Sequence, residues 1–165
     1  MITLKQVLVA TDFSEPSDAA CAYGRELAVR FGATLHVIHV VQTVPPGAFG
    51  MEGYIVIGPQ LQKEMEDDAR QRLDELVMDS DHSGPAIATA VIVASSPASA
   101  IIGYAAAHRI DLVVLGTHGR GALAHVIMGS VAETVVRLAP CPVLTVKHPE
   151  HDFVHPNTLT VTAGA

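Results

Sequence analysis

The chain has 165 residues, of which 49% are hydrophobic, and this length and composition fit a single domain with a sizeable core. Its formal net charge is −7, and no basic cluster interleaved with aromatic residues occurs, so we expect no nucleic-acid partner. No apolar run approaches the roughly 20 residues of a membrane span, and the first residues lack the pattern of a signal peptide. We therefore expect a cytoplasmic protein with no membrane partner.

The first part of the chain is typical of a strand, a helix and a second strand. Residues 6–11 form a short β-branched apolar run, and Ser14 follows as the expected cap of a helix. Apolar residues then recur at helical spacing until Gly32, which stands where a helix-ending glycine is expected. The pattern predicts a strand over 6–11, a helix over 16–31 and a strand over 34–41.

The middle of the chain continues this alternation. Residues 43–59 are rich in Pro and Gly and exceed the usual connection of about 4–6 residues, which favours a lid or flap. An amphipathic pattern predicts a helix over 61–77. A third strand is expected over 86–93, and Ser96 then introduces a helix from 97 to about 108.

The last elements are a strand over 111–115, a helix over 131–138 and a strand over 143–146. Strands that alternate with helices indicate a parallel sheet with helices on both faces. Ligands of such sheets bind beyond the carboxyl ends of the strands, where the strand order reverses. Asp12 and Gly116 both follow strands directly, so both could line that crevice.

A glycine-punctuated loop follows the fourth strand. Gly116, Gly119 and Gly129 can adopt backbone angles closed to other residues and can bring several N–H groups to one anion. Ser130 is the expected N-cap of the next helix, with Glu133 completing a capping box. The alternative is a glycine-rich turn with an ordinary cap. The spacing of a Walker loop is absent, and the position after the fourth strand disfavours a dinucleotide site.

Metal and redox chemistry have little support in the sequence. Cys21 and Cys141 are isolated, which predicts free or buried thiols. His36 and His39 lie three residues apart in a predicted strand, so their side chains should face opposite sides of the sheet and should not share a metal ion.

Several motifs stand in order along the chain: Thr-Asp-Phe-Ser-Glu at 11–15, His39-Val40, Gly-x2-Gly-x9-Gly-Ser from Gly116 to Ser130, and Pro-Val-Leu-Thr-Val at 142–146. With these motifs on a five-strand pattern, the chain resembles the universal stress protein family, specifically its ATP-binding branch. The resemblance covers about residues 5–147.

This resemblance implies an α/β, Rossmann-like fold of three layers, with a doubly wound five-stranded parallel sheet in the order 3-2-1-4-5. It also implies a nucleotide-binding domain over 1–147, and we expect residues 148–165 to be a loosely held tail. A homodimer would form through the fifth strand, at Val143, Leu144 and Val146, since pairing with a second copy would cover an exposed sheet edge.

The resemblance also assigns roles to individual residues. Asp12 would accept a ribose hydroxyl, although it could instead cap the following turn. Val40 would offer its backbone to adenine. Glycine-loop amides and the Ser130 hydroxyl would hold the phosphates, and the loop side chains would contact phosphate or point to solvent. The predicted nucleotide-binding set is Ala10, Thr11, Asp12, Val40, Gly116, Thr117, His118, Gly119, Arg120, Gly129, Ser130 and Val131.

The function implied is that of an ATP-binding stress-response homodimer, regulated by its nucleotide, with at most slow ATP hydrolysis. The ligand could also be ADP or AMP, and Mg²⁺ would accompany ATP. No catalytic residue or protein metal ligand is assigned. A nucleotide-free dimerisation module and an adenylate-forming or ATP-cleaving enzyme are the alternatives.

Overall fold

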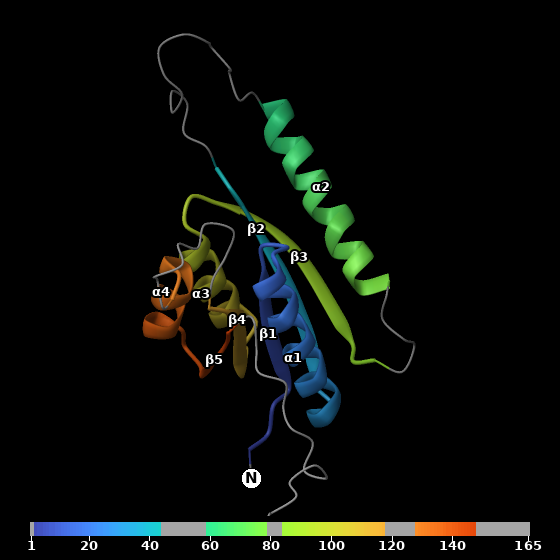
Figure 1. The fold of residues 1–165 in the computed structure, drawn as a ribbon, viewed down its shortest axis with the longest axis vertical. Coiled ribbons are helices and arrows are strands. Elements are labelled where there is room, and N and C mark those ends of the chain that lie inside the picture. The colour runs from blue at the N-terminus through green and yellow to red at the C-terminus, as the bar shows by residue number, and fades with distance from the viewer. Residues whose placement is uncertain (1, 44–58, 79–83, 118–127, 148–165) are drawn as a thin grey trace, which may run out of the picture.

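The chain folds into a parallel β-sheet with helices on both faces (Figure 1). We describe it from a computed structural model, which covers residues 2–43, 59–78, 84–117 and 128–147. Within these residues the sheet has five strands in the order β3-β2-β1-β4-β5, and each neighbouring pair is parallel. The predicted fold class and strand order are therefore confirmed.

The elements follow the predicted alternation along the chain. Their bounds are β1 (Gln6–Thr11), α1 (Glu15–Phe31), β2 (Thr34–Gln42), α2 (Pro59–Met78), β3 (Ile87–Ala94), α3 (Pro97–Ala107), β4 (Leu112–Gly116), α4 (Ser130–Leu138) and β5 (Val143–Val146). Strands β1 and β5 have the predicted bounds, and the other elements differ from the prediction by one or two residues at one or both ends. The predicted lid, apart from its end residues, and the predicted tail lie outside the described residues.

Helix α1 begins and ends at residues suited to those positions. Ser14 is its N-cap, in an extended conformation, and Pro16 lies in the first turn, where its missing N–H costs nothing. The helix ends at Gly32, whose φ of 63° is left-handed and whose N–H donates to the carbonyls of the last turn. Both predicted signals are confirmed.

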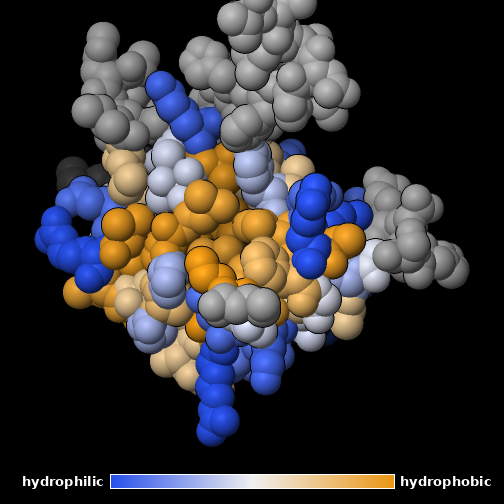
Figure 2. Space-filling model, turned by 90° about the horizontal axis from the view of Figure 1, so that it is seen from below, coloured by the Kyte–Doolittle hydropathy of each residue, from blue (hydrophilic) through white to orange (hydrophobic). Residues whose placement is uncertain are grey.

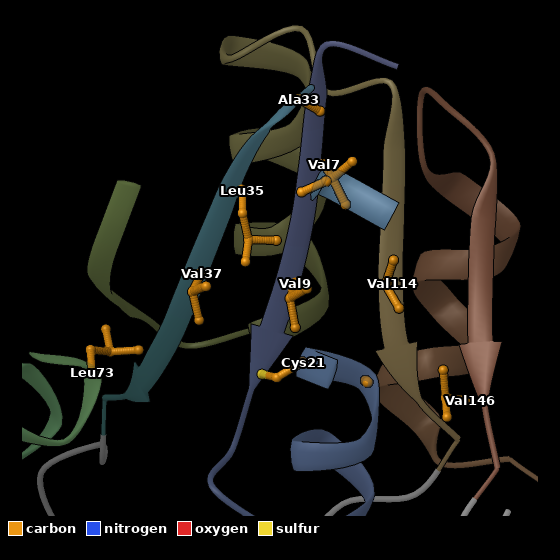
Figure 3. Packing of buried hydrophobic residues seen from close by; sticks show 11 residues of the cluster. Val7, Val9, Cys21, Ala33, Leu35, Val37, Leu73, Val114 and Val146 are labelled. Carbon is orange, nitrogen blue, oxygen red and sulfur yellow. The ribbon is translucent and has the colours of Figure 1, made fainter. Parts of the chain in front are cut away.

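The core lies in two layers, one on each face of the sheet. Helices α1 and α2 cover one layer, to which β1 contributes Val7 and Val9 beside Leu35 and Val37 of β2 (Figure 3). Helices α3 and α4 cover the other, which contains Leu8. Because β1 is buried on both faces, its apolar residues run continuously instead of alternating with polar ones.

Apolar surface gathers at the amino ends of the strands, with polar side chains around it (Figure 2). Exposed hydrophobic residues near this end include Phe31, the last residue of α1, and Leu138, the last residue of α4. This end is opposite to the carboxyl ends of the strands, where ligands are expected to bind. Among the helices in the described ranges, none has the length and apolar character needed to cross a bilayer.

Candidate functional site

Strands β1 and β4 stop pairing before their carboxyl ends, at the place where the order of strands in the sheet reverses. Pairing between β1 and β4 extends only to Val9 and Val114, whereas pairing between β1 and β2 continues to Thr11 and His39. The carboxyl ends of β1 and β4 therefore border a switch point, the place where open α/β sheets bind ligands.

The turn after β1 is a closed hydrogen-bond network. The Thr11 hydroxyl accepts from the Phe13 N–H at 2.9 Å and lies 2.9 Å from Oγ of Ser17. The Ser17 hydroxyl donates to the Ser14 carbonyl at 2.8 Å and accepts from the Ser14 N–H at 3.0 Å. Because Thr11 and Ser17 are both buried, these hydrogen bonds hold the turn in place on the side that faces the protein interior.

Asp12 has a structural role in this turn. Its Oδ1 accepts from the Ser14 N–H at 3.2 Å and from the Ser14 hydroxyl. The sequence left open that Asp12 caps the turn that follows it, and Asp12 has this capping role in the structure. A carboxylate offers about four acceptor positions on two oxygens, so capping through Oδ1 is compatible with a ligand contact.

Phe13 occupies an unusual conformation next to Asp12. Its φ is 59°, in the left-handed region that bulky residues rarely adopt. The ring contacts His39, at 4.5 Å between ring centroids, and Arg72 of α2, whose Cζ is 4.4 Å from the Phe13 centroid. Nδ1 of His39 is 2.8 Å from the Thr11 carbonyl oxygen, to which it donates.

The contacts of Phe13 with His39 and Arg72 were not predicted from the sequence. Phe13 and His39 belong to motifs that assign neither residue a role, and Arg72 lies on the polar face of a predicted helix. The available signal was Phe13 itself, a bulky residue in the turn that caps the following helix. Nothing in the local pattern around Arg72 points to Phe13.

Gly116 is required by close packing. A Cβ atom there would lie 2.7 Å from the carbonyl oxygen of Pro16, in the first turn of α1. Among the described glycines, only Gly32 has a positive φ, so the expectation of special backbone angles is wrong for Gly116 and Gly129. At Gly116 the absence of a side chain matters, because β4 ends directly against α1.

The start of α4 differs from the prediction by one residue. Gly129, extended at φ −68° and ψ 152°, is the N-cap, so Ser130 is the first helical residue. The Gly129 N–H donates to the Thr117 carbonyl at 2.7 Å, and this tertiary hydrogen bond holds Gly129 outside the helix. The expected capping box is therefore wrong, and Glu133 instead pairs with Arg137 at 2.8 Å.

The N-terminus of α4 is also chemically distinct. Its cap residue is a glycine, and no side chain of the described residues caps it. In contrast, the Ser96 side chain caps α3 by accepting from the Ser99 N–H at 3.3 Å. The first N–H groups of a helix have no acceptor within the helix, and together with the helix dipole they favour an anion.

The structure brings part of the predicted set together. Ala10, Val40 and Val131 all pack against the apolar cluster beneath α3 and α4. Thr117 and Gly129 are joined by their backbone hydrogen bond, and the Thr117 N–H donates to the Val146 carbonyl at 2.8 Å. His118, Gly119 and Arg120 lie outside the described residues.

The two strand histidines face opposite sides of the sheet, as predicted. His36 meets Tyr104 of α3, at 3.0 Å between Nδ1 and the phenol oxygen, whereas His39 contacts Phe13 on the α1 side. Within the described ranges, no group of three or more potential metal-ligating side chains comes together. Cys21 and Cys141 are both free thiols.

Comparison with known proteins agrees with this fold. The model of the universal stress protein family matches residues 3–147. The universal stress protein MJ0531 of Methanocaldococcus jannaschii is 32% identical over 148 residues, which cover 90% of this chain and 85% of the relative.

Solved structures agree as well. The universal stress protein UspA from Lactobacillus plantarum has a TM-score of 0.70 at 28% identity, covering 88% of this chain and 99% of its own. The universal stress protein from Archaeoglobus fulgidus in complex with dAMP shares the fold, with a TM-score of 0.54 at 22% identity, covering 89% of this chain and 100% of its own. The chain belongs to the universal stress protein family.

Proposed function

We propose that this protein is an ATP-binding regulatory homodimer that acts in a stress response and hydrolyses ATP slowly at most. The observation that carries the proposal is the N-terminus of α4, which no described side chain caps and which is tied to the end of β4 through Gly129 and Thr117. Such a helix end favours phosphate, and it lies at the end of the sheet where a ligand is expected. The Archaeoglobus fulgidus relative, solved with dAMP, supports an adenine nucleotide as the ligand.

The proposed contacts divide between phosphate, ribose and adenine. The N–H groups of Ser130 and Val131 and the Ser130 hydroxyl would donate to phosphate, together with the loop residues His118, Gly119 and Arg120. The Gly129 N–H already donates to Thr117, so it does not contribute in this state. Asp12 would accept from ribose, and the backbone of Val40 would meet adenine.

Mg²⁺ would enter with ATP. It prefers oxygen ligands in octahedral geometry and commonly binds substrate phosphates with few protein ligands. Among the described residues no group of three or more potential metal-ligating side chains comes together.

Binding without rapid turnover is the expected behaviour. A general base needs a free position near the attacking water. Asp12 is a carboxylate of the proposed site, and its Oδ1 accepts two hydrogen bonds from Ser14. These bonds fix the carboxylate in an orientation suited to recognition.

The homodimer would form through β5. This strand lies at one edge of the sheet, where it pairs with β4. Val143 and Leu144 are half-buried, and an exposed edge with apolar residues favours pairing with a second copy. Sedimentation at micromolar concentration should detect a dimer, and a monomer alone would contradict this part of the proposal.

The first test is mass spectrometry of nucleotides that remain bound when the natural protein is purified without denaturation. We expect ATP or another adenine nucleotide. Titration calorimetry with ATP and with AMP then measures affinity directly. If neither ligand binds at millimolar concentration, the proposed function is wrong.

Two variants of Ser130 make this test specific to α4. Ser130→Pro removes the N–H and the hydroxyl, yet proline is well tolerated at the first helical position and the extended Gly129 can precede it. Ser130→Ala removes only the hydroxyl. We expect Ser130→Pro to weaken ATP binding by about tenfold or more and Ser130→Ala to weaken it less, because hydrogen bonds to charged groups contribute about 1.5–3 kcal/mol.

A further inference from the structure

The turn that presents Asp12 depends on the conformation of Phe13. The chain reverses after β1 through the left-handed Phe13, whose N–H donates to the Thr11 hydroxyl at 2.9 Å. The next residue, Ser14, donates two hydrogen bonds to Asp12. A change in the Phe13 backbone would therefore move the groups that hold the Asp12 carboxylate.

The left-handed conformation is unfavourable for phenylalanine and persists only where the surroundings hold it. Phe13 packs against the apolar cluster beneath α1 and α2, and two side chains from other elements contact its ring. His39 of β2 stacks on the Phe13 ring with a 30° tilt and is itself fixed through its Nδ1 to Thr11. Arg72 of α2 lies over the ring, 4.4 Å from its centroid.

Within the described ranges Arg72 forms no ion pair, so no acidic side chain competes with the Phe13 ring for its guanidinium group. Its neighbour Arg70 behaves differently. Arg70 is exposed and pairs with Glu66 at 3.4 Å and with Asp67 at 3.1 Å. The two arginines of α2 thus have separate roles, one at the surface of the helix and one against the turn.

Helix α2 is anchored on the face of the sheet that α1 also covers. It packs on β2 and β3, with Leu73 almost fully buried next to Arg72 in sequence. Arg25 of α1 also donates to the Leu76 carbonyl of α2 at 3.2 Å. Displacing α2 would therefore remove the cation from the Phe13 ring.

We propose that Arg72 is a positioning residue for nucleotide binding, which acts by holding Phe13 and, through it, the Asp12 turn. This inference rests on the proposed function. Because coupling between two events is reciprocal, a nucleotide that uses Asp12 also stabilises α2 against the sheet. Occupancy of the site would then affect a helix that supplies none of the proposed nucleotide contacts.

The test compares Arg72→Gln with Arg70→Gln in the full chain, by calorimetric titration with ATP and Mg²⁺. Both variants lose one positive charge from the same helix, so their effect on long-range attraction of ATP is matched. We expect Arg72→Gln to weaken ATP binding about three- to tenfold and Arg70→Gln to leave it unchanged. Arg72→Lys, which keeps a cation, should restore part of the affinity.

A second variant and a second measurement separate positioning from general stability. Phe13→Asn tolerates the left-handed conformation but lacks the ring, so combining it with Arg72→Gln should weaken binding by less than the product of the single effects. Hydrogen exchange should show that ATP slows exchange of α2 amides in the natural protein and does so less in folded Arg72→Gln at saturating ATP.

The outcomes distinguish the two proposals. If the natural protein binds ATP while Arg72→Gln binds equally well and shows the same protection of α2, the role of Arg72 is overturned and the proposed function stands. If the natural protein does not bind ATP, both are overturned. Selective weakening by Arg72→Gln with loss of α2 protection supports both.

Discussion

A Cβ atom on Gly116 would lie 2.7 Å from the carbonyl oxygen of Pro16 and 2.9 Å from its carbonyl carbon. The end of β4 is therefore in direct contact with the first turn of α1, and the two elements beside the switch point are held against each other. This contact involves backbone atoms, which cannot rotate away as a side chain can.

We expect Gly116→Ala to lower the free energy of unfolding by about 1–3 kcal/mol, because the added methyl group forces the two backbones apart. Urea denaturation measures this change. Gly103→Ala is the matched control, since Gly103 lies inside α3 and nothing stands within 4 Å of the position that its methyl group would take. That control should stabilise by about 0.5–1 kcal/mol through helix propensity. Equal effects of the two substitutions would contradict the steric explanation.

Asp111 connects the start of β4 to the start of β1. Its Oδ2 accepts from the backbone N–H groups of Lys5 and Gln6, at 2.7 and 2.9 Å. We expect Asp111→Ala to lower the free energy of unfolding by about 1–3 kcal/mol, since two amides would lose a charged acceptor. Urea denaturation again gives the change, and Asp74→Ala, at an exposed position of α2, should have little effect. An Asp111→Ala protein as stable as the natural one would show that water replaces the carboxylate.

The fold could be predicted from the sequence because its signals are local. The apolar run of residues 6–11 is a strand buried on both faces, and Gly32 is the only described glycine that has the left-handed angle expected of a helix end. The start of α4 could not be fixed in the same way. Gly129 and Ser130 are both acceptable caps, and the choice depends on the hydrogen bond from Gly129 to Thr117.

The position of the candidate site could be predicted from the sequence, but fewer of the contacts within it could. The sequence placed Asp12 at the carboxyl end of β1, where it lies, and left open the capping role that Oδ1 performs. The contact between Phe13 and Arg72 joins segments far apart in the chain. Helical periodicity describes which face Arg72 occupies on α2, but it contains no information about which distant ring that face meets.

Cys21 should be inert in the folded protein. Burial, and then the negative charge of Asp18, raise the pKa of the Cys21 thiol to about 12. At pH 8 only about one thiol in ten thousand would be ionised, and the thiolate is the reactive form. In a Cys141→Ser variant, which leaves Cys21 as the one cysteine of the chain, iodoacetamide should label slowly in buffer and rapidly in urea. Rapid labelling in buffer would show that α1 opens at this position.

His36 should make folding stability depend on pH. Burial, and then the charge of His108, lower the pKa of His36 below its usual value. Its ring nitrogens lie 2.7 Å from the Gln6 side-chain oxygen and 3.0 Å from the Tyr104 hydroxyl, so the neutral ring has a partner on each side. Tyr104 also stacks on His108, at 3.8 Å between centroids, which keeps the second histidine close.

The sign of this effect follows from the direction of the shift. Above the unfolded pKa of about 6.5, His36 is neutral in both states and its contribution to stability is complete. As the pH falls below that value, the unfolded chain binds a proton before the folded protein does, so the free energy of unfolding decreases until the folded pKa is passed. Urea denaturation between pH 7.5 and pH 5 should show a steeper decrease for the natural protein than for His36→Gln.

Proton NMR of the His36 ring gives the direct measurement. We expect its midpoint to lie below 6.5 and to rise in His108→Gln, because that substitution removes the neighbouring positive charge while burial by the sheet and α3 remains. A midpoint that stays constant in His108→Gln would leave burial as the whole cause. A midpoint at or above 6.5 would show that the interface between β2 and α3 admits enough water to solvate the charged ring.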